Sequence, residues 1–144
     1  MKEIVNKLKA ILDKDLPLMS NLSNASSVIY SLPDLNWCGF YLLEGETLYL
    51  GPFQGEPACT KIRVGHGVCG TAAQERKTIV VDDVNQFKGH IACSSLSKSE
   101  IVVPLFKEDK IIGVLDIDAP IYSRFKAEDV KLIEECAHII EKIL

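Results

Sequence analysis

The sequence predicts an α+β domain with a central antiparallel sheet and with N- and C-terminal helices packed on one face of that sheet. Near both ends, apolar residues recur at helical spacing, whereas the middle carries short aromatic, apolar and β-branched runs. Two pairs of these runs are joined by short turn segments, which is typical of hairpins. Strands grouped between helices favour this fold class. The 144 residues suit one domain, expected to span positions 1–144.

Two helices are expected before the sheet. The apolar positions of the first are Val5, Leu8, Ile11 and Leu12. Pro17 ends or restarts this helix, and a second helix is expected over residues 18–30. Pro33 closes the second helix, because the residue before a proline is pushed out of the helical region.

The next region predicts a hairpin. Residues 37–43 are aromatic and apolar, 44–46 carry a turn signal, and 47–50 return as the second strand. Residues 51–57 are so rich in Gly and Pro that a loop is expected there.

The middle of the chain is less regular. A short strand is expected over 61–64, a loose turn leading into a helix of small residues over 65–73, and a β-branched strand over 78–81. Residues 82–99 show little periodicity. A long irregular segment inside a small domain is usually functional or disordered, and its apolar residues favour a function.

A second hairpin and a helix complete the predicted fold. The strands cover 100–106 and 111–117, with the turn at 107–110, and the last helix covers 126–144. The buried stripe of that helix is expected to hold Ile133, Ala137, Ile140 and Leu144.

Charge and hydropathy exclude several classes of partner. The formal net charge is −4 and the sequence lacks a Lys/Arg-rich run, which argues against a nucleic-acid partner. No apolar run approaches the roughly 20 residues needed to span a membrane. The first 15 residues lack the apolar core of a signal peptide, so a cytoplasmic protein is expected. Five cysteines in that compartment indicate buried packing, metal ligands or redox chemistry rather than structural disulfides.

Two of the cysteines fit the core. Cys38 lies in the first strand, on the face opposite Trp37 and Tyr41, and Cys136 lies beside the stripe of the last helix. Because free cysteine is among the most buried residue types, both are interpreted as packing residues.

The other three cysteines suggest chemistry. Cys59, Cys69 and Cys93 each lie in a segment rich in Gly, Pro or Ser, where side chains can be exposed. Zinc sites usually show closely spaced cysteine pairs, whereas these positions differ by 10 and 24. His66 and His90 could add ligands, but the spacing favours redox work, and neither a metal nor a cofactor is expected.

Acidic and aromatic residues could form the rest of a site. Asp116 and Asp118 lie two apart at a strand end and should point to the same face, while Glu100 opens the preceding strand. Neighbouring carboxylates raise one another's pKa and usually serve a cation, a metal or proton transfer. The alternative is that they simply meet solvent. Trp37 and Tyr41 share a face, as core residues or as the wall of a ligand site.

Several strings together resemble the free methionine-(R)-sulfoxide reductases, which are built on a GAF domain. The strings are NWCGFY at 36–41, GPFQG at 51–55, PAC at 57–59, GVCGTA at 67–72, GHIAC at 89–93, SEIVVP at 99–104 and GVLDID at 113–118. They fall in order from about Trp37 to the end of the chain. GAF domains in general share the fold but lack these three cysteines.

The resemblance implies reduction of free L-methionine-(R)-sulfoxide. It assigns Cys93 as the nucleophile and Cys59 as the resolving cysteine, and it gives Cys69 a secondary or substrate-contacting role. It further implies that Glu100, Asp116 and Asp118 bind the substrate ammonium and sulfoxide oxygen, with Trp37 and Tyr41 around the methyl-sulfur end. Thioredoxin is the implied reductant and a homodimer the implied assembly.

Two positions depart from the family pattern. Ser94 stands where an acidic residue is expected after the catalytic cysteine, and Cys38 where a small apolar residue is usual.

Three rival interpretations remain open from the sequence. A GAF ligand sensor would explain the fold but leave the loop cysteines unused. A redox or metal sensor would use the cysteines to change shape. A structural dimerisation domain would account for none of the acidic residues.

Overall fold

The fold is a six-stranded antiparallel sheet with helices on both faces. The computed structural model describes residues 2–91, 93 and 95–144. The strand order is β3-β2-β1-β6-β5-β4. The strands are β1 (Trp37–Glu44), β2 (Thr47–Gly55), β3 (Lys61–Arg63), β4 (Ile79–Val81), β5 (Ser99–Lys107) and β6 (Lys110–Ala119). The helices are α1 (Lys2–Ile11), α2 (Leu18–Tyr30), α3 (Gly67–Glu75) and α4 (Ala127–Glu141), with a 3₁₀ helix, η1 (Val84–Gln86).

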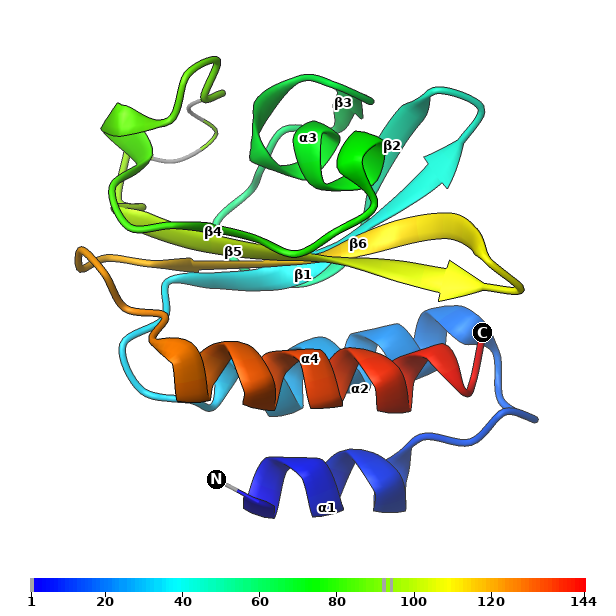
Figure 1. Cartoon of the computed structure of the whole chain (residues 1–144). Coiled ribbons are helices and arrows are strands. Elements are labelled where there is room, and N and C mark those ends of the chain that lie inside the picture. Colours follow the sequence, from blue (N-terminus) through cyan, green and yellow to red (C-terminus); the bar gives the residue numbers. More distant parts are fainter. Residues whose placement is uncertain (1, 92, 94) are drawn as a thin grey trace.

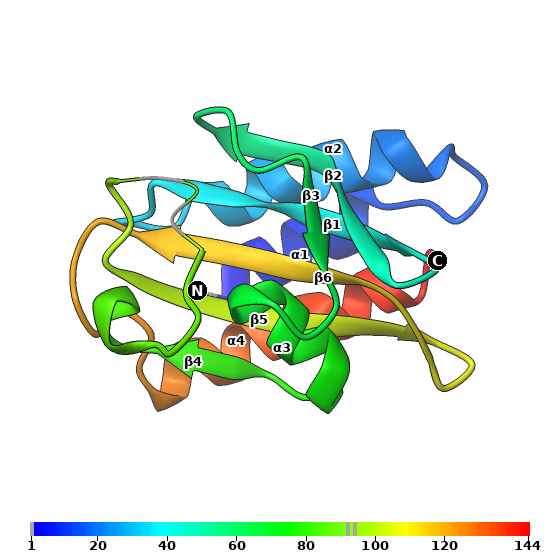
Figure 2. The same cartoon turned by 90° about the horizontal axis from the view of Figure 1, so that it is seen from above.

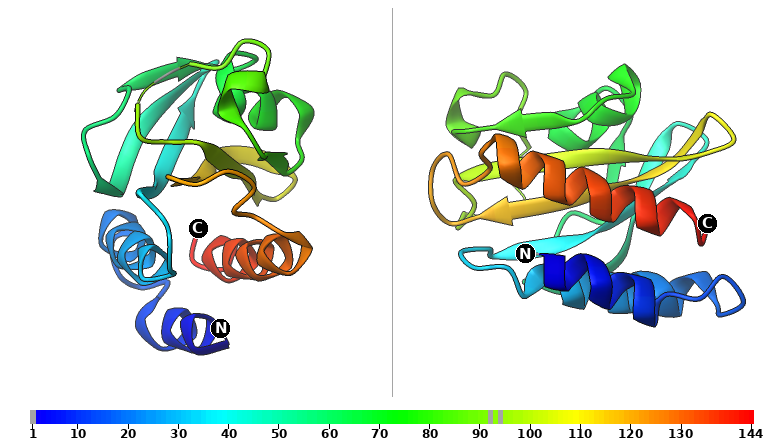
Figure 3. Two further views of the ribbon diagram at one scale, coloured as in Figure 1. Left: turned by 90° about the vertical axis from the view of Figure 1, so that its left-hand side faces the viewer. Right: turned by 60° about the horizontal axis from the view of Figure 1, so that its bottom comes forward.

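The helices divide between the two faces of the sheet. The helices α2 and α4 cover one face, and α1 packs beneath both of them as an outer layer (Figure 1 and Figure 3). On the other face lie α3 and the segment that contains η1, above β5, β6 and β1 (Figure 2). The predicted class, with N- and C-terminal helices on one face of an antiparallel sheet, is confirmed.

The helical face holds the larger hydrophobic core. Its fully buried side chains include Leu8, Leu22, Ile29, Phe40, Leu115 and Ile140. Cys38 and Cys136 are both buried in this core, as expected. The cysteine of β1 and the cysteine of α4 therefore pack on the opposite side of the sheet from Trp37 and Tyr41.

Two apolar positions at helix ends are less buried than other apolar residues of the same helices, and one of them, Leu144, was expected to be buried. Ile11 is 40% exposed, because α1 is an outer helix that turns only Ile4, Val5 and Leu8 toward its neighbours. Leu144 lies beyond the end of α4 and only packs at the edge of the core. None of the described helices is long and apolar enough to cross a bilayer.

The strand β2 is longer than the sequence predicts. The expected loop at 51–57 is wrong over its first part, because β2 continues to Gly55. Gly39 pairs with Phe53 but Tyr41 pairs with Leu50, so two residues of β2 stand opposite one residue of β1. Pro52 occupies this bulge, where the ladder is interrupted and its missing N–H is tolerated.

Candidate functional site

Three carboxyl groups share the face of the sheet opposite the terminal helices. Asp118 in β6 is paired with Glu100 in β5 on one side and with Trp37 in β1 on the other. Asp116 lies two residues before Asp118 on β6 and therefore points to the same face. Its partner on β1 is Gly39, and a Cβ atom added there would lie 2.7 Å from the Trp37 ring. The indole ring of Trp37 therefore lies over Gly39, next to Asp116.

Burial raises the pKa values of these three carboxyl groups above their ordinary range. Glu100 is 7% exposed and Asp116 5% exposed. Burial raises the pKa of Glu100 well above its ordinary value, and the charges of Asp116 and Asp118 raise it further. Burial also raises the pKa of Asp118, with a further contribution from Asp116. Burial raises the pKa of Asp116 as well, but hydrogen bonds from Glu100 and Cys69 act in the opposite direction. Asp116 is therefore the member most readily ionised.

Cys69 faces the same cluster from the first turns of α3. Its side chain is buried, and the thiol is hydrogen-bonded to the Asp116 carboxyl group. Burial raises the pKa of the Cys69 thiol, and the neighbouring acidic charges of Asp116 and Glu100 raise it further. The thiol therefore stays protonated and donates to Asp116, which makes it a poor nucleophile in this state.

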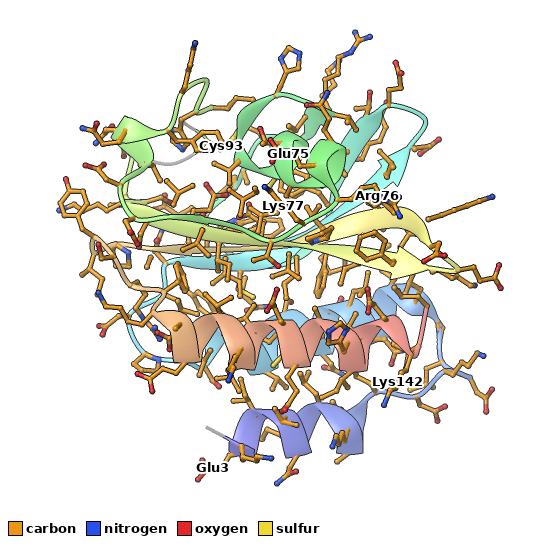
Figure 4. All side chains as sticks on the ribbon, viewed as in Figure 1. Glu3, Glu75, Arg76, Lys77, Cys93 and Lys142 are labelled. Carbon is orange, nitrogen blue, oxygen red and sulfur yellow. A yellow bond between two sulfur atoms is a disulfide. The ribbon has the colours of Figure 1, made fainter. Side chains whose placement is uncertain are left out.

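A disulfide joins Cys59 and Cys93 across 34 residues, with their Cα atoms 5.4 Å apart. Cys93 lies in the loop on the α3 side of the sheet (Figure 4). It lines a pocket with Cys69, Trp37, Tyr41 and the three acids. Cys59 follows the pocket residues Pro57 and Ala58 in the chain, so the disulfide lies next to the acidic pocket.

The two aromatic residues of β1 hold the loop that carries Cys59. Trp37 Nε1 donates to the carbonyl oxygen of Glu56 at 3.0 Å, and Tyr41 Oη donates to the carbonyl oxygen of Cys59 at 2.8 Å. The Trp37 ring stacks with both Tyr41 and Phe53, with centroid distances of 6.0 and 5.3 Å. Trp37 and Tyr41 therefore line the pocket and also hold the Cys59 loop in place, an arrangement we call the aromatic tether. The sequence did not indicate these hydrogen bonds, because the bonded residues lie 18 and 19 positions apart.

Three further polar residues reach the site without having been assigned to it from the sequence. Ser97 is hydrogen-bonded to Asp118, and its hydroxyl accepts a bond from Asn36 Nδ2 at 3.1 Å. His90 lines the pocket. Burial lowers the pKa of its ring and so favours the neutral form, whereas the charge of Asp116 acts in the opposite direction. The sequence had offered His90 only as a possible metal ligand, and Asn36 and His90 only as members of the family strings; Ser97 had no signal beyond its place in the irregular segment.

Open hydrogen-bonding capacity remains in the pocket. Asp116 Oδ1 and Asp118 Oδ1 are buried and have no hydrogen-bond partner within residues 2–91, 93 and 95–144. A buried acceptor without a partner carries a desolvation penalty, so a donor or cation entering the pocket would relieve it.

The site residues expected from the sequence thus converge. Cys93, Cys69, Trp37, Tyr41 and the three acids line one pocket, and Cys59 joins them through the disulfide. Cys38 and Cys136 do not take part. The expectation about Ser94 falls outside the described residues, and His66 does not line the pocket.

Comparisons with known proteins agree with this geometry. The GAF domain family matches residues 18–144. The free methionine-R-sulfoxide reductase of Escherichia coli is 47% identical over 136 residues, which are 94% of this chain and 82% of that protein. The chain belongs to this reductase family. A further member, fRMsr of Staphylococcus aureus in its reduced form, is 54% identical with a TM-score of 0.96, over 99% of this chain and 94% of that one.

A third reductase of the family has been solved with its substrate. This enzyme, from Neisseria meningitidis, is 42% identical with a TM-score of 0.93, over 99% of this chain and 86% of the other. The resemblance drawn from the seven strings is confirmed at the level of fold and family. As a GAF domain of the reductase family, the chain carries its pocket on the face of the sheet that the terminal helices leave free.

Proposed function

We propose that this protein reduces free L-methionine-(R)-sulfoxide to L-methionine. The observation that carries the proposal is the Cys59–Cys93 disulfide, one cysteine of which lines a pocket together with the carboxyl groups of Glu100, Asp116 and Asp118. Relatives named free methionine-R-sulfoxide reductase support it, as do relatives solved in complex with their substrate.

Glu100 is the proposed proton donor to the sulfoxide oxygen. A sulfoxide sulfur becomes electrophilic only when its oxygen is protonated or strongly hydrogen-bonded, which requires an acid that keeps its proton near neutral pH. Burial and two neighbouring aspartates raise the pKa of Glu100 in that direction. The paired Asp118 lies on the same face and helps to retain the proton.

Cys93 is the proposed nucleophile. Its thiolate attacks the substrate sulfur, the oxygen passes to the Cys93 sulfur, and methionine leaves with a two-electron gain. The Cys93 sulfenic acid then condenses with the Cys59 thiol, which forms the disulfide and releases one water molecule. An external dithiol reduces the disulfide and restores both thiols.

Asp116 and Asp118 are the proposed partners of the substrate ammonium. Each has one buried oxygen without a partner in the described chain, and an ammonium group can donate to both. A methionine inside a protein chain has no ammonium group next to its side chain. This contrast explains a preference for the free amino acid, and comparable reduction of a sulfoxide-containing peptide would contradict it.

Cys69 is proposed to position Asp116 rather than to attack substrate. Its protonated thiol donates to the carboxylate that we assign to the ammonium. The proposal further includes thioredoxin as the physiological dithiol, the cytoplasm as the location and a homodimer as the assembly. Light scattering on the purified protein tests the dimer, and turnover with thioredoxin and its reductase tests the reductant.

The decisive assay uses purified protein, dithiothreitol and racemic free methionine sulfoxide. Chiral chromatography follows both epimers, with Cys93→Ser as the variant and Cys136→Ala as a matched control that removes a thiol from the helical core. Loss of the R epimer alone, abolished only by Cys93→Ser, is the expected result. Persistence of both epimers with wild-type protein would refute the proposed function.

A further inference from the structure

The acidic pocket contains a compact set of metal-binding atoms. One ligand atom from each of Cys69, Glu100 and Asp116 lies within 4.8 Å of the other two, and all three residues are buried. They come from α3, β5 and β6, so the rigid sheet and a packed helix hold them together. Their spacing of 31 and 16 positions explains why the sequence shows no zinc signature.

A second observation points to a missing cation. Asp116 is 5% exposed, lines the pocket, and has one carboxylate oxygen without a partner in the described chain. Lys and Arg are absent from the described residues that line this pocket. Three acids gathered without a basic side chain leave negative charge that only protons or an incoming cation can neutralise.

We propose that the substrate-free pocket binds one thiophilic divalent cation, Zn²⁺ in particular, through Cys69, Glu100 and Asp116. The cation would exclude the substrate and so inhibit the enzyme. The inhibition rests on the proposed function, whereas the binding itself does not.

The donor set selects this class of metal. A thiolate with two carboxylates suits Zn²⁺, while Mg²⁺ and Ca²⁺ prefer oxygen ligands alone. Zinc–sulfur bonds of about 2.3 Å and zinc–oxygen bonds of about 2.1 Å require ligand atoms roughly 3.5 Å apart in a tetrahedron. The present spread of at most 4.8 Å therefore has to contract by about 1 Å, which small side-chain rotations can supply.

Three protein ligands leave the fourth position of a tetrahedral zinc site for water or a further ligand. His90 lines the same space, and its neutral imidazole is a suitable donor. On binding, the Cys69 thiol and the Glu100 carboxyl group each release a proton to solvent, and the new sulfur–metal bond replaces the hydrogen bond from Cys69 to Asp116, with no change in oxidation state. Because Asp116 is also assigned to the substrate ammonium, metal and substrate cannot occupy the pocket together.

The disulfide form of the protein gives the cleanest test. Cys59 and Cys93 are then blocked, and the remaining thiols are Cys38, Cys69 and Cys136, all of them buried. Zinc is titrated against a chromophoric chelator without added thiol. The variants are Cys69→Ala and Asp116→Asn, with Cys136→Ala as the control, because it removes a buried thiol from a helix on the other side of the sheet.

One equivalent of zinc is expected for wild-type protein and for Cys136→Ala. Because substitutions outside the ligand sphere already weaken zinc sites about 10- to 100-fold, loss of a ligand in Cys69→Ala or Asp116→Asn should raise the dissociation constant by at least about 100-fold. Unchanged zinc affinity in Cys69→Ala, or no saturable binding to wild type, would overturn the proposal.

A spectroscopic readout on wild-type protein guards against misfolded variants. Cobalt added to the disulfide form should give a sulfur-to-metal charge-transfer band that zinc abolishes, and a spectrum without that band would contradict thiolate ligation. Inhibition is then measured as methionine formed in a single turnover of reduced protein, with and without zinc. An inactive protein that still shows the band would refute the reductase proposal alone, whereas an active protein without the band would refute the metal site alone.

Discussion

Removing only the hydroxyl group of Tyr41 tests whether the aromatic tether controls closure of the disulfide. In Tyr41→Phe the ring stays against Trp37, while the 2.8 Å bond to the carbonyl oxygen of Cys59 is lost. Tyr41 is 1% exposed, so water cannot readily replace the missing donor. Loss of a buried partner costs about 1–3 kcal/mol.

The rate effect follows from the part of that energy that orients Cys59. If about 1.0–1.4 kcal/mol is lost when the loop closes on Cys93, disulfide formation slows about 5- to 10-fold. Formation of methionine precedes closure and should keep its rate, and KM should not change. The Cys93 sulfenic acid should therefore accumulate in Tyr41→Phe.

The assay is a quenched single turnover. Reduced protein freed of reductant is mixed with one equivalent of free methionine-(R)-sulfoxide, and methionine, dimedone-labelled Cys93 and the disulfide are quantified over time. Tyr49→Phe is the matched control, because Tyr49 lies on the same hairpin but is 45% exposed. An equal slowing of methionine formation and disulfide closure would refute the tether, as would closure at the wild-type rate.

Further predictions concern Glu100, the cysteines and Arg124. Glu100→Gln should lower kcat by about 10²- to 10⁴-fold, as expected for a lost general acid. Burial raises the Glu100 pKa in the folded state above its ordinary value of 4.5. As the pH rises above 4.5, the unfolded chain loses this proton while the folded protein keeps it, so the free energy of unfolding of the wild type falls. Urea unfolding should therefore show Glu100→Gln gaining stability relative to wild type as the pH rises above 4.5; a constant difference would contradict the assignment. Cys69→Ser keeps a donor to Asp116 and should retain disulfide formation, whereas Cys59→Ser should stop at the sulfenic acid; a Cys69–Cys93 disulfide in Cys59→Ser, found by mass spectrometry, would make Cys69 a resolving residue. Arg124→Ala removes an ion pair to α4 at 3.2 Å and two bonds to the loop after α2, so unfolding should become about 1–3 kcal/mol easier with kcat unchanged.

The sequence predicted most of the fold because periodicity and turn chemistry agree locally. Residues 18–30 form the expected helix, and both hairpins occur where their turns indicated. The end of β2 escaped prediction because Gly51 and Pro52 are loop-like residues, and only pairing with β1 makes them part of a strand. The exposure of Ile11 likewise depends on which neighbours α1 meets, and the helical pattern alone does not contain that information.

The site residues were recognisable as types, but their arrangement depends on strand register. Counted from the turn of a regular β5–β6 hairpin, Glu100 would face Ile117, which points to the other side of the sheet. The register shifts between Leu105 and Phe106, and this shift brings Asp118 opposite Glu100. The pairing of Glu100 with Asp118 therefore depends on an irregularity in the strand register that cannot be predicted from the local sequence. The tether from Tyr41 to the Cys59 carbonyl is equally long-range.

Two cysteines form the disulfide and the other three are buried, so the number of thiols that react with a colorimetric reagent reports the state of the protein. In the native disulfide state, Cys38, Cys69 and Cys136 are all buried and react slowly with a bulky thiol reagent. Native reduced protein should therefore release two equivalents of chromophore rapidly and the oxidised protein none, while denaturant exposes three more in either state. A single absorbance trace thus reports the oxidation state in its fast phase and the integrity of the fold in its slow one.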